Sequence, residues 1–108
     1  MYDNSMNDKQ KLKDFKPLAL ACKALSHPAR LAILHTLARR GSCICGEIVE
    51  VMPLSQATVS QHLKVLKDAG LITGEVDGPK SCYCINEATM SRLRDQFGQL
   101  FVSLENCC

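Results

Sequence analysis

The sequence predicts a mainly α-helical domain that carries a small β-hairpin, and three observations support this prediction. Apolar residues recur at helical spacing in several segments. One of these segments begins with a strong N-capping residue, Ser55, and ends at Gly70, where a helix C-cap belongs. Two short β-prone segments, 71–76 and 81–85, flank Asp77-Gly78, a dipeptide typical of tight hairpins. A chain of 108 residues is long enough for one such domain and too short for two.

Two helices are expected on either side of the break at Ser26-His27-Pro28. Residues 1–13 are expected to form a disordered or loosely helical arm, so that the domain spans residues 14–106. The first helix has one apolar stripe, made of Phe15, Leu18, Cys22 and Leu25. The second helix starts at Pro28, since proline is tolerated at the first helical position, and ends at Arg39-Arg40-Gly41.

The segments on either side of the capped helix are shorter. Residues 42–45 are expected to form a brief strand or the lead-in to a helix, and residues 47–52 a short helix that ends at Pro53. A last helix follows Asn86, which is expected to cap it, and a Cys-Cys tail, residues 107–108, ends the sequence. The apolar stripe of the last helix consists of Met90, Leu93, Phe97, Leu100 and Leu104. Because so small a chain cannot bury this stripe and that of the first helix internally, we expect a homodimer formed through the first and last helices.

A short helix, a tight connection, a capped helix and then a hairpin is the order of elements in a winged helix-turn-helix. The second helix of such a pair lies in the major groove of DNA, with its N-terminal residues against base edges. Glutamine can bond adenine, serine and threonine reach bases or phosphates, and lysine meets phosphates. The residues expected to contact double-stranded DNA are Gln56, Ala57, Thr58, Ser60, Gln61, His62, Lys64 and Lys80.

The cysteines indicate the chemistry of a second site. No segment has the apolar length of a secretory signal or of a membrane span, so we expect a cytoplasmic protein without a membrane partner, its thiols kept reduced. Six of the seven cysteines form three close pairs, which favours metal binding or redox chemistry over a disulfide framework. A Gly-rich phosphate loop and a Cys-His-Asp arrangement are both absent from the sequence, so an enzyme is not expected.

Three segments resemble the arsenical-resistance repressor (ArsR/SmtB) family. Residues 54–72 resemble its recognition-helix signature, and residues 25–34 resemble its second-helix motif. Cys43-Ile-Cys45-Gly-Glu-Ile48 is similar to its Cys-Val-Cys-Asp-Leu metalloid box. The resemblance covers roughly residues 15–104 and implies a dimeric transcriptional repressor that loses affinity for operator DNA when an inducer binds. One departure is that the wing has a single basic residue, Lys80.

The inducer is expected to bind cysteine thiolates. The last-helix site of metal-sensing relatives needs histidine, and no histidine follows Asn86. If residues 42–45 form a strand beside the return strand of the hairpin, alternation would put the sulfurs of both Cys-x-Cys pairs on one face. The expected ligands are Cys43 and Cys45 with one or both of Cys82 and Cys84, and the rival extra ligands are Cys107 and Cys108.

Thiolate number separates the candidate inducers. Three thiolates suit As(III) or Sb(III), whereas Cd(II), Pb(II) or Zn(II) would take three or four. Cys22 shares the apolar stripe of the first helix and is expected to be a buried or interface residue. A repressor of the same fold that senses thiol oxidation is the alternative function.

Overall fold

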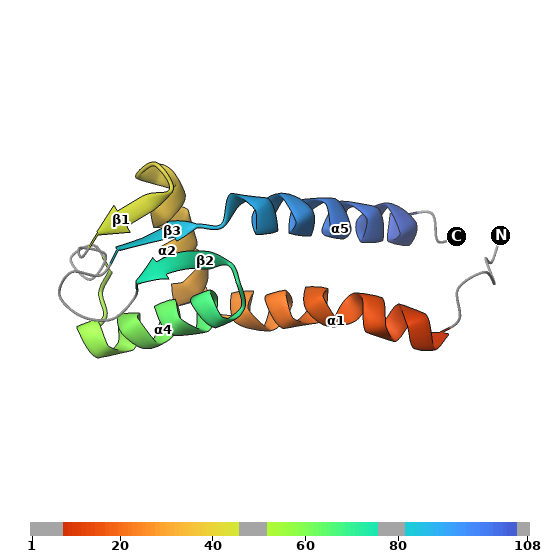
Figure 1. The fold of residues 1–108 in the computed structure, drawn as a ribbon, viewed down its shortest axis with the longest axis horizontal. Coiled ribbons are helices and arrows are strands. Elements are labelled where there is room, and N and C mark those ends of the chain that lie inside the picture. The colour runs from red at the N-terminus through yellow and green to blue at the C-terminus, as the bar shows by residue number, and fades with distance from the viewer. Residues whose placement is uncertain (1–7, 46–51, 76–81, 106–108) are drawn as a thin grey trace.

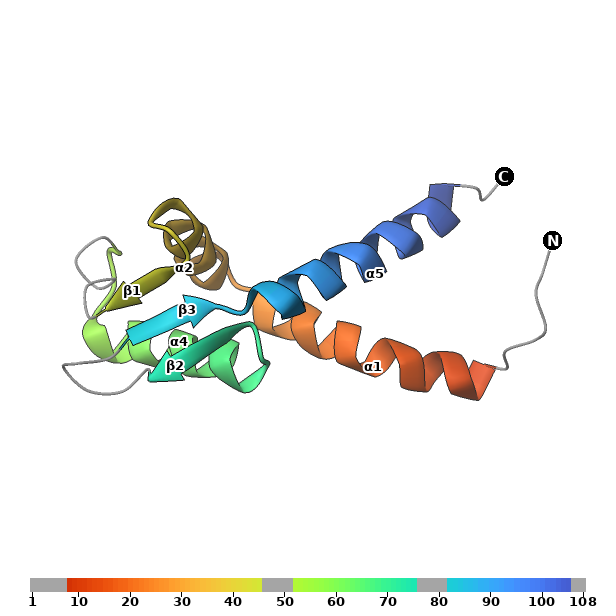
Figure 2. The same cartoon turned by 45° about the horizontal axis from the view of Figure 1, so that its top comes forward.

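The computed structural model of the chain describes residues 8–45, 52–75 and 82–105. The helices in these ranges are α1 (Asp8–Leu25), α2 (Pro28–Arg39), α4 (Gln56–Asp68) and α5 (Glu87–Glu105). The strands are β1 (Cys43–Cys45), β2 (Ile72–Glu75) and β3 (Cys82–Ile85). The sheet, α2 and α4 form a head, from which α1 and α5 extend in the same direction as two arms (Figures 1 and 2). The molecule is accordingly long and narrow, 54 × 24 × 21 Å, and has the predicted winged-helix order of elements.

Helix α1 begins at Asp8, six residues before the predicted start. An acidic residue in the first turn favours a helix N-terminus, and the Gln10 amide donates to the Asp14 carboxylate at 3.2 Å one turn later. These polar contacts extend the helix into a segment that has little apolar periodicity.

The buried side of α1 also differs from the predicted stripe. Leu18, Ala21 and Ala24 are buried, whereas Cys22 is exposed and Phe15 remains 43% exposed. Of the predicted stripe, Leu18 is buried, together with two alanines whose small side chains let the neighbouring helices approach closely. Cys22 is therefore not buried within the single chain, and its place at an interface stays a prediction.

The three strands form one antiparallel sheet in the order β1-β3-β2. This arrangement confirms both the hairpin and the third strand expected beside its return strand. Gly74, opposite Tyr83, has a φ of +112°, and a Cβ atom there would overlap the carbonyl oxygen of Cys82. The sheet therefore requires glycine at this position.

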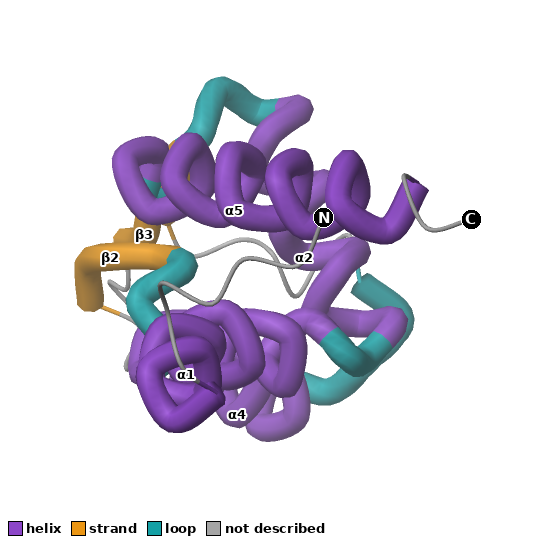
Figure 3. The backbone as a smooth tube through the Cα atoms, turned by 90° about the vertical axis from the view of Figure 1, so that its right-hand side faces the viewer, coloured by secondary structure: helices purple, strands orange, loops and turns teal. Residues whose placement is uncertain are grey.

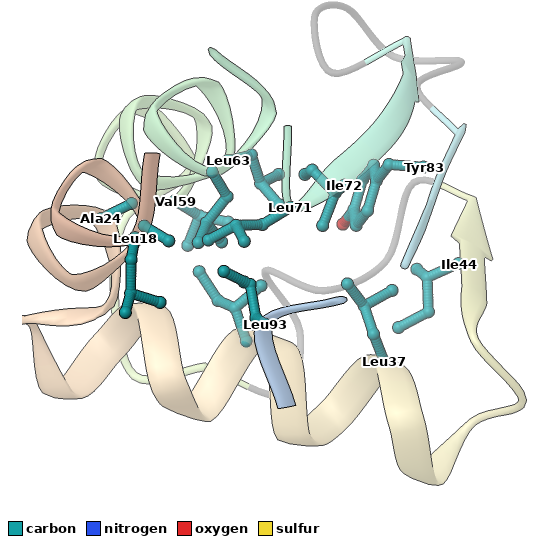
Figure 4. Close-up of a cluster of buried hydrophobic side chains, with 13 residues drawn as sticks. Leu18, Ala24, Leu37, Ile44, Val59, Leu63, Leu71, Ile72, Tyr83 and Leu93 are labelled. Atoms are coloured by element: carbon teal, nitrogen blue, oxygen red, sulfur yellow. The ribbon is translucent and has the colours of Figure 1, made fainter. Parts of the chain in front are cut away.

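The inner face of the sheet packs on the core of the head. Ile44, Tyr83 and Ile72 point toward Leu37 of α2 (Figure 4). Leu63 of α4 and Leu93 at the start of α5 also line this cluster (Figure 4). The core thus joins one face of the sheet to α2, α4 and α5.

Several predicted features lie outside the described residues. These are the short helix at 47–52 apart from Met52, the hairpin turn at 77–78 and the Cys-Cys tail.

None of the described helices is long and apolar enough to cross a membrane. Seen along the arms, α5 and α1 are two separate helices on opposite sides of the view (Figure 3).

Candidate functional site

The four cysteines of β1 and β3 lie in two facing pairs, as the sequence predicted. Cys43 is opposite Cys84, and Cys45 is opposite Cys82. Side chains alternate between the two faces of a strand, so all four sulfurs lie on one face. The Cα atoms are 4.0 Å apart in each pair. The sheet therefore gathers four sulfur atoms from two segments about 40 residues apart.

Backbone hydrogen bonding explains why the paired cysteines are so close. The backbone N–H of Ile85 donates to the carbonyl of Ser42 at 2.8 Å. Hydrogen-bonded and non-hydrogen-bonded pairs alternate along antiparallel strands. Both cysteine pairs thus occupy non-hydrogen-bonded positions, where facing side chains are nearest to each other.

Both cysteine pairs are disulfides in this structure, Cys43–Cys84 and Cys45–Cys82. The expectation of free thiols at these positions therefore needs correction, because facing cysteines at non-hydrogen-bonded positions are close enough to bond. In this oxidised state, no group of three or more His, Cys, Asp or Glu side chains among the described residues could hold a metal ion. A soft ion can bind the four sulfurs only after reduction, because the thiolate is the ligand.

The two faces of the sheet have opposite exposure. Cys43, Cys45 and Cys82 are exposed and Cys84 is half-buried. On the other face Tyr83 is 1% exposed and is among the largest fully buried side chains. The sulfurs are therefore open to small molecules in solution, while the strands that hold them are anchored in the core.

Helix α4 begins as the sequence predicted. The Ser55 hydroxyl accepts a hydrogen bond from the backbone N–H of Thr58 at 3.2 Å and donates to the Thr58 hydroxyl at 3.0 Å. The buried side of the helix consists of Val59, Leu63 and Leu66. The cap sets where the helix begins, and the buried apolar side sets its rotation, so the opposite, polar side faces solvent.

The residues expected to contact DNA differ in exposure. Gln56, Ala57, Gln61 and Lys64 are exposed on α4, whereas Thr58, Ser60 and His62 are half-buried. Lys80 lies outside the described residues. The exposed glutamines and Lys64 have the freest access to a groove.

His62 makes contacts within the chain that the sequence did not reveal. Its Nδ1 accepts a hydrogen bond from Nε of Arg30 at 3.3 Å, and its ring lies 4.4 Å from that of His27, between centroids. His27 caps α2, because its Nδ1 accepts from the backbone N–H of Ala29 at 3.0 Å. Burial, then the neighbouring His27 and then the Arg30 guanidinium lower the pKa of His62 below its usual value.

Arg30 also ties this cluster to α1. Its Nη1 donates to the carbonyl of Ala24 at 3.1 Å and to that of Lys23 at 3.3 Å. One side chain of α2 therefore links the middle of α4 to the end of α1. Contacts of this kind join residues 32 positions apart, which no local pattern in the sequence indicates.

Asn86 connects the sheet, α4 and α5. Its side-chain amide donates to the carbonyl of Gly70 at 3.1 Å, just beyond the end of α4. Its Oδ1 accepts from the backbone N–H of Thr89 at 3.2 Å and so caps α5, as predicted. Asn86 is two residues after Cys84, so its side chain links the end of β3 to both helices.

The arms carry much of the exposed apolar surface of the described chain. Exposed large side chains include Leu12, Phe15 and Leu20 on α1 and Phe101, Val102 and Leu104 on α5. Between the arms lies a cavity of about 240 Å³, whose lining includes Phe15, Leu18, Gln96 and Leu100. The Oε1 atom of Gln96 is buried without a hydrogen-bond partner among the described residues.

A capped recognition helix with an exposed polar side, followed by a β-hairpin, defines a winged-helix DNA-binding regulator. A family model described as a helix-turn-helix domain matches residues 25–75. The chain is 38% identical over 87 residues to the arsenical resistance operon repressor of Bacillus subtilis (strain 168), covering 80% of this chain and 74% of that protein. It is 33% identical to the repressor of the same name from Staphylococcus aureus, covering 86% of this chain and 88% of that protein. The chain therefore belongs to the ArsR/SmtB family of transcriptional regulators, which are not enzymes.

A solved structure supports the same fold. The ArsR-like transcriptional regulator from Rhodococcus sp. RHA1 superposes with a TM-score of 0.69 at 21% identity. The match covers 86% of this chain and 87% of that one. At this level of identity the likeness bears on the architecture alone.

Proposed function

We propose that this protein is a homodimeric, cytoplasmic repressor that releases operator DNA when reduced cysteines of the sheet capture As(III) or Sb(III). The observation that carries this proposal is the strand register, which gathers Cys43, Cys45, Cys82 and Cys84 on one exposed face. Two relatives are named as arsenical resistance operon repressors, which supports an arsenical inducer. Three of the four sulfurs would satisfy the trivalent metalloid.

Other soft ions are the nearest alternative inducers. All four thiolates would suit a tetrahedral Zn(II) or Cd(II), and Pb(II) could take three. Cys107 and Cys108 remain rival ligands outside the described residues.

Asn86 provides a route from the site to the DNA. An ion that draws β1 and β3 together repositions Cys84, and Asn86 two residues later bonds both Gly70 and the first turn of α5. A shift there tilts α4 at its C-terminal end. Its exposed N-terminal residues, such as Gln56 and Gln61, would then leave the register of the major groove.

The arms support the homodimer. Their exposed apolar side chains and the unpartnered Oε1 of Gln96 are groups that a second copy would cover. A two-fold dimer would set its recognition helices about 34 Å apart, one turn of DNA. Sedimentation of the reduced protein should give a dimer at micromolar concentration, and a monomer would contradict this part of the proposal.

The test of the proposal is operator release by the reduced protein. A phosphine reductant is used, because a thiol reductant would compete for the ions. Arsenite and antimonite should release DNA from the wild type, and a Cys43→Ser, Cys45→Ser double variant, which keeps only two sulfurs on the sheet, should lose the response. Cys107→Ser and Cys108→Ser serve as matched controls and should still respond. Loss of response in these tail variants, with a Cys82→Ser, Cys84→Ser double variant unaffected, would overturn the strand-pair site.

The disulfides favour a second candidate function, a repressor that senses thiol oxidation. Oxidation that joins Cys43 to Cys84 and Cys45 to Cys82 would itself lock β1 against β3. The operator affinity of metal-free protein, measured with oxidant or with arsenite added, distinguishes the two functions. If oxidant alone changes operator affinity and arsenite does not, the redox function replaces the metalloid function.

The DNA interface has its own test. Gln61→Ala should cost about 1–3 kcal/mol on the operator if its contact to a base is bidentate. Lys64→Ala should weaken binding to all sequences alike and reduce the salt dependence. If operator affinity survives both changes, the exposed side of α4 does not read the DNA.

A further inference from the structure

Glu75 is the one charged residue on the three strands, and it lies in line with a cysteine pair. Cys82 is opposite Cys45 on one side and opposite Glu75 on the other. Directly opposite residues share a face of the sheet, so the carboxylate lies on the face that carries the sulfurs. The exposure of β2 agrees, since Ile72 is 1% exposed on the inner face while Glu75 is exposed.

The separation of Glu75 from the sulfurs follows from the hydrogen-bond pattern. The backbone N–H of Asn86 donates to the carbonyl of Leu71 at 3.0 Å, which makes this a hydrogen-bonded pair. Alternation makes Glu75 and Cys82 a hydrogen-bonded pair as well, with Cα atoms about 5.5 Å apart. The Glu75 side chain is thus attached one strand spacing from Cys82, on the exposed face that carries the sulfurs.

The candidate inducers change the charge of this site differently. Arsenite reacts as As(OH)3 + 3 RSH → As(SR)3 + 3 H2O, so that three As–O bonds become As–S bonds and the charge stays zero. A divalent ion that takes all four thiols gives M²⁺ + 4 RSH → [M(SR)4]²⁻ + 4 H⁺, and two negative charges accumulate on the sheet face. A neighbouring carboxylate opposes the second reaction and leaves the first nearly unaffected.

We propose that Glu75 is a specificity-determining residue, whose carboxylate disfavours divalent ions and so biases the four-cysteine face toward trivalent arsenic or antimony. This inference rests on the proposed function, because it assumes that the reduced cysteines bind the inducer. It adds the reason why a site with enough sulfurs for a tetrahedral ion would respond to a metalloid instead.

The test compares affinities of the reduced, full-length protein for Cd(II) and for arsenite. Binding is followed by the ultraviolet absorption of the sulfur–ion bonds, again with a phosphine reductant. Glu75→Gln should tighten Cd(II) binding by about three- to tenfold, as removal of one charge about 7 Å from a dianion in a solvent-exposed site requires. Arsenite affinity should change less than about twofold. Glu75→Lys should tighten Cd(II) binding further, and a higher salt concentration should reduce the effect of both substitutions on this affinity.

Glu105→Gln is the matched control, since Glu105 lies at the far end of α5 and its loss should change neither affinity. Weaker Cd(II) binding in Glu75→Gln would overturn the inference and make Glu75 a ligand. An unchanged ratio of Cd(II) to arsenite affinity would overturn it as well. If the wild type binds neither ion, the proposed function itself fails, which is a result distinct from binding without selectivity.

Discussion

The two faces of the small sheet share the same strands and yet differ in every other respect. The inner face carries Ile44, Ile72 and Tyr83, which are almost wholly buried against α2 and α4. The outer face carries the four cysteines and Glu75, most of them exposed. A step of one residue, from Cys82 to Tyr83, separates candidate chemistry from core packing. The comparison teaches that a strand can supply reactive groups at no cost to the core, because alternation keeps the two sets of side chains apart.

Truncation of a side chain on the inner face should have the largest effect on the free energy of unfolding. Tyr83→Ala removes a large, fully buried side chain and should lower the free energy of unfolding by about 3–5 kcal/mol. Cys84→Ser, one residue along and on the outer face, is the matched variant and should cost far less in the reduced protein. Urea unfolding measures both. Equal losses would mean that the two faces are not independent.

Reduction of the two disulfides should cause the second largest loss of stability. The outer bond closes a loop with a sequence separation of 41 residues, and the inner bond lies within that loop. Loss of both should lower the free energy of unfolding by about 2–4 kcal/mol, because the unfolded chain regains its freedom. Urea unfolding with and without a phosphine reductant measures the change. A Cys43→Ser, Cys45→Ser double variant should show no response to the reductant.

Gly74→Ala should damage both faces at once. A Cβ atom at this position overlaps the backbone of Cys82, and the φ of +112° is unfavourable for any other residue. The expected loss is about 1–3 kcal/mol in the free energy of unfolding, together with a weaker response to arsenite. Gly98→Ala is the control, since a Cβ atom there meets nothing within 4 Å. If Gly74→Ala keeps wild-type stability, β2 can pair with β3 in a backbone conformation that does not require glycine.

Asn86→Ala should separate sensing from folding. Loss of the α5 cap is expected to cost about 1 kcal/mol. The bond to Gly70 disappears as well, so inducer binding should persist while operator release weakens. Titration of arsenite, followed in parallel by thiol absorption and by DNA release, distinguishes the two effects. Full release at wild-type arsenite concentrations would rule out this route.

The smallest expected effect is a dependence of stability on pH. The pKa of His62 is lower in the folded protein than its usual value of 6.5, so the unfolded chain binds the proton more tightly. Stability should therefore be complete above about pH 6.5 and decline as the pH falls toward the folded pKa. His62→Gln should flatten this dependence, and His35→Gln, at an exposed position of α2, should leave it unchanged. Thermal unfolding between pH 5 and pH 8 provides the measurement.

Local patterns in the sequence predicted the elements and much of the sheet. Ser55 and Asn86 are capping residues at positions where the periodicity begins, and both cap helices in the structure. The pairing of β1 with β3 was expected from the layout of a winged helix, and alternation along the two Cys-x-Cys segments then placed the four sulfurs on one face.

Contacts between distant residues were not predictable in the same way. The cluster of His27, Arg30 and His62 depends on how α2 crosses α4, and histidine is an unusual helix cap. The burial of Ala21 and Ala24 in place of Cys22 depends on how closely α1 approaches its neighbours. The disulfides follow from the same geometry that gathers the sulfurs, but their oxidation state is not encoded in the spacing.

The outward positions of the sheet also offer a route to new specificities. Cys43, Cys45, Thr73, Glu75, Cys82 and Cys84 form two rows of three side chains that the core does not constrain. Sulfur could be exchanged for imidazole or carboxylate at these places with the inner, core-facing side chains of the strands unchanged. A screen of such variants, with a reporter gene under operator control, could yield biosensors of the same fold for different ions.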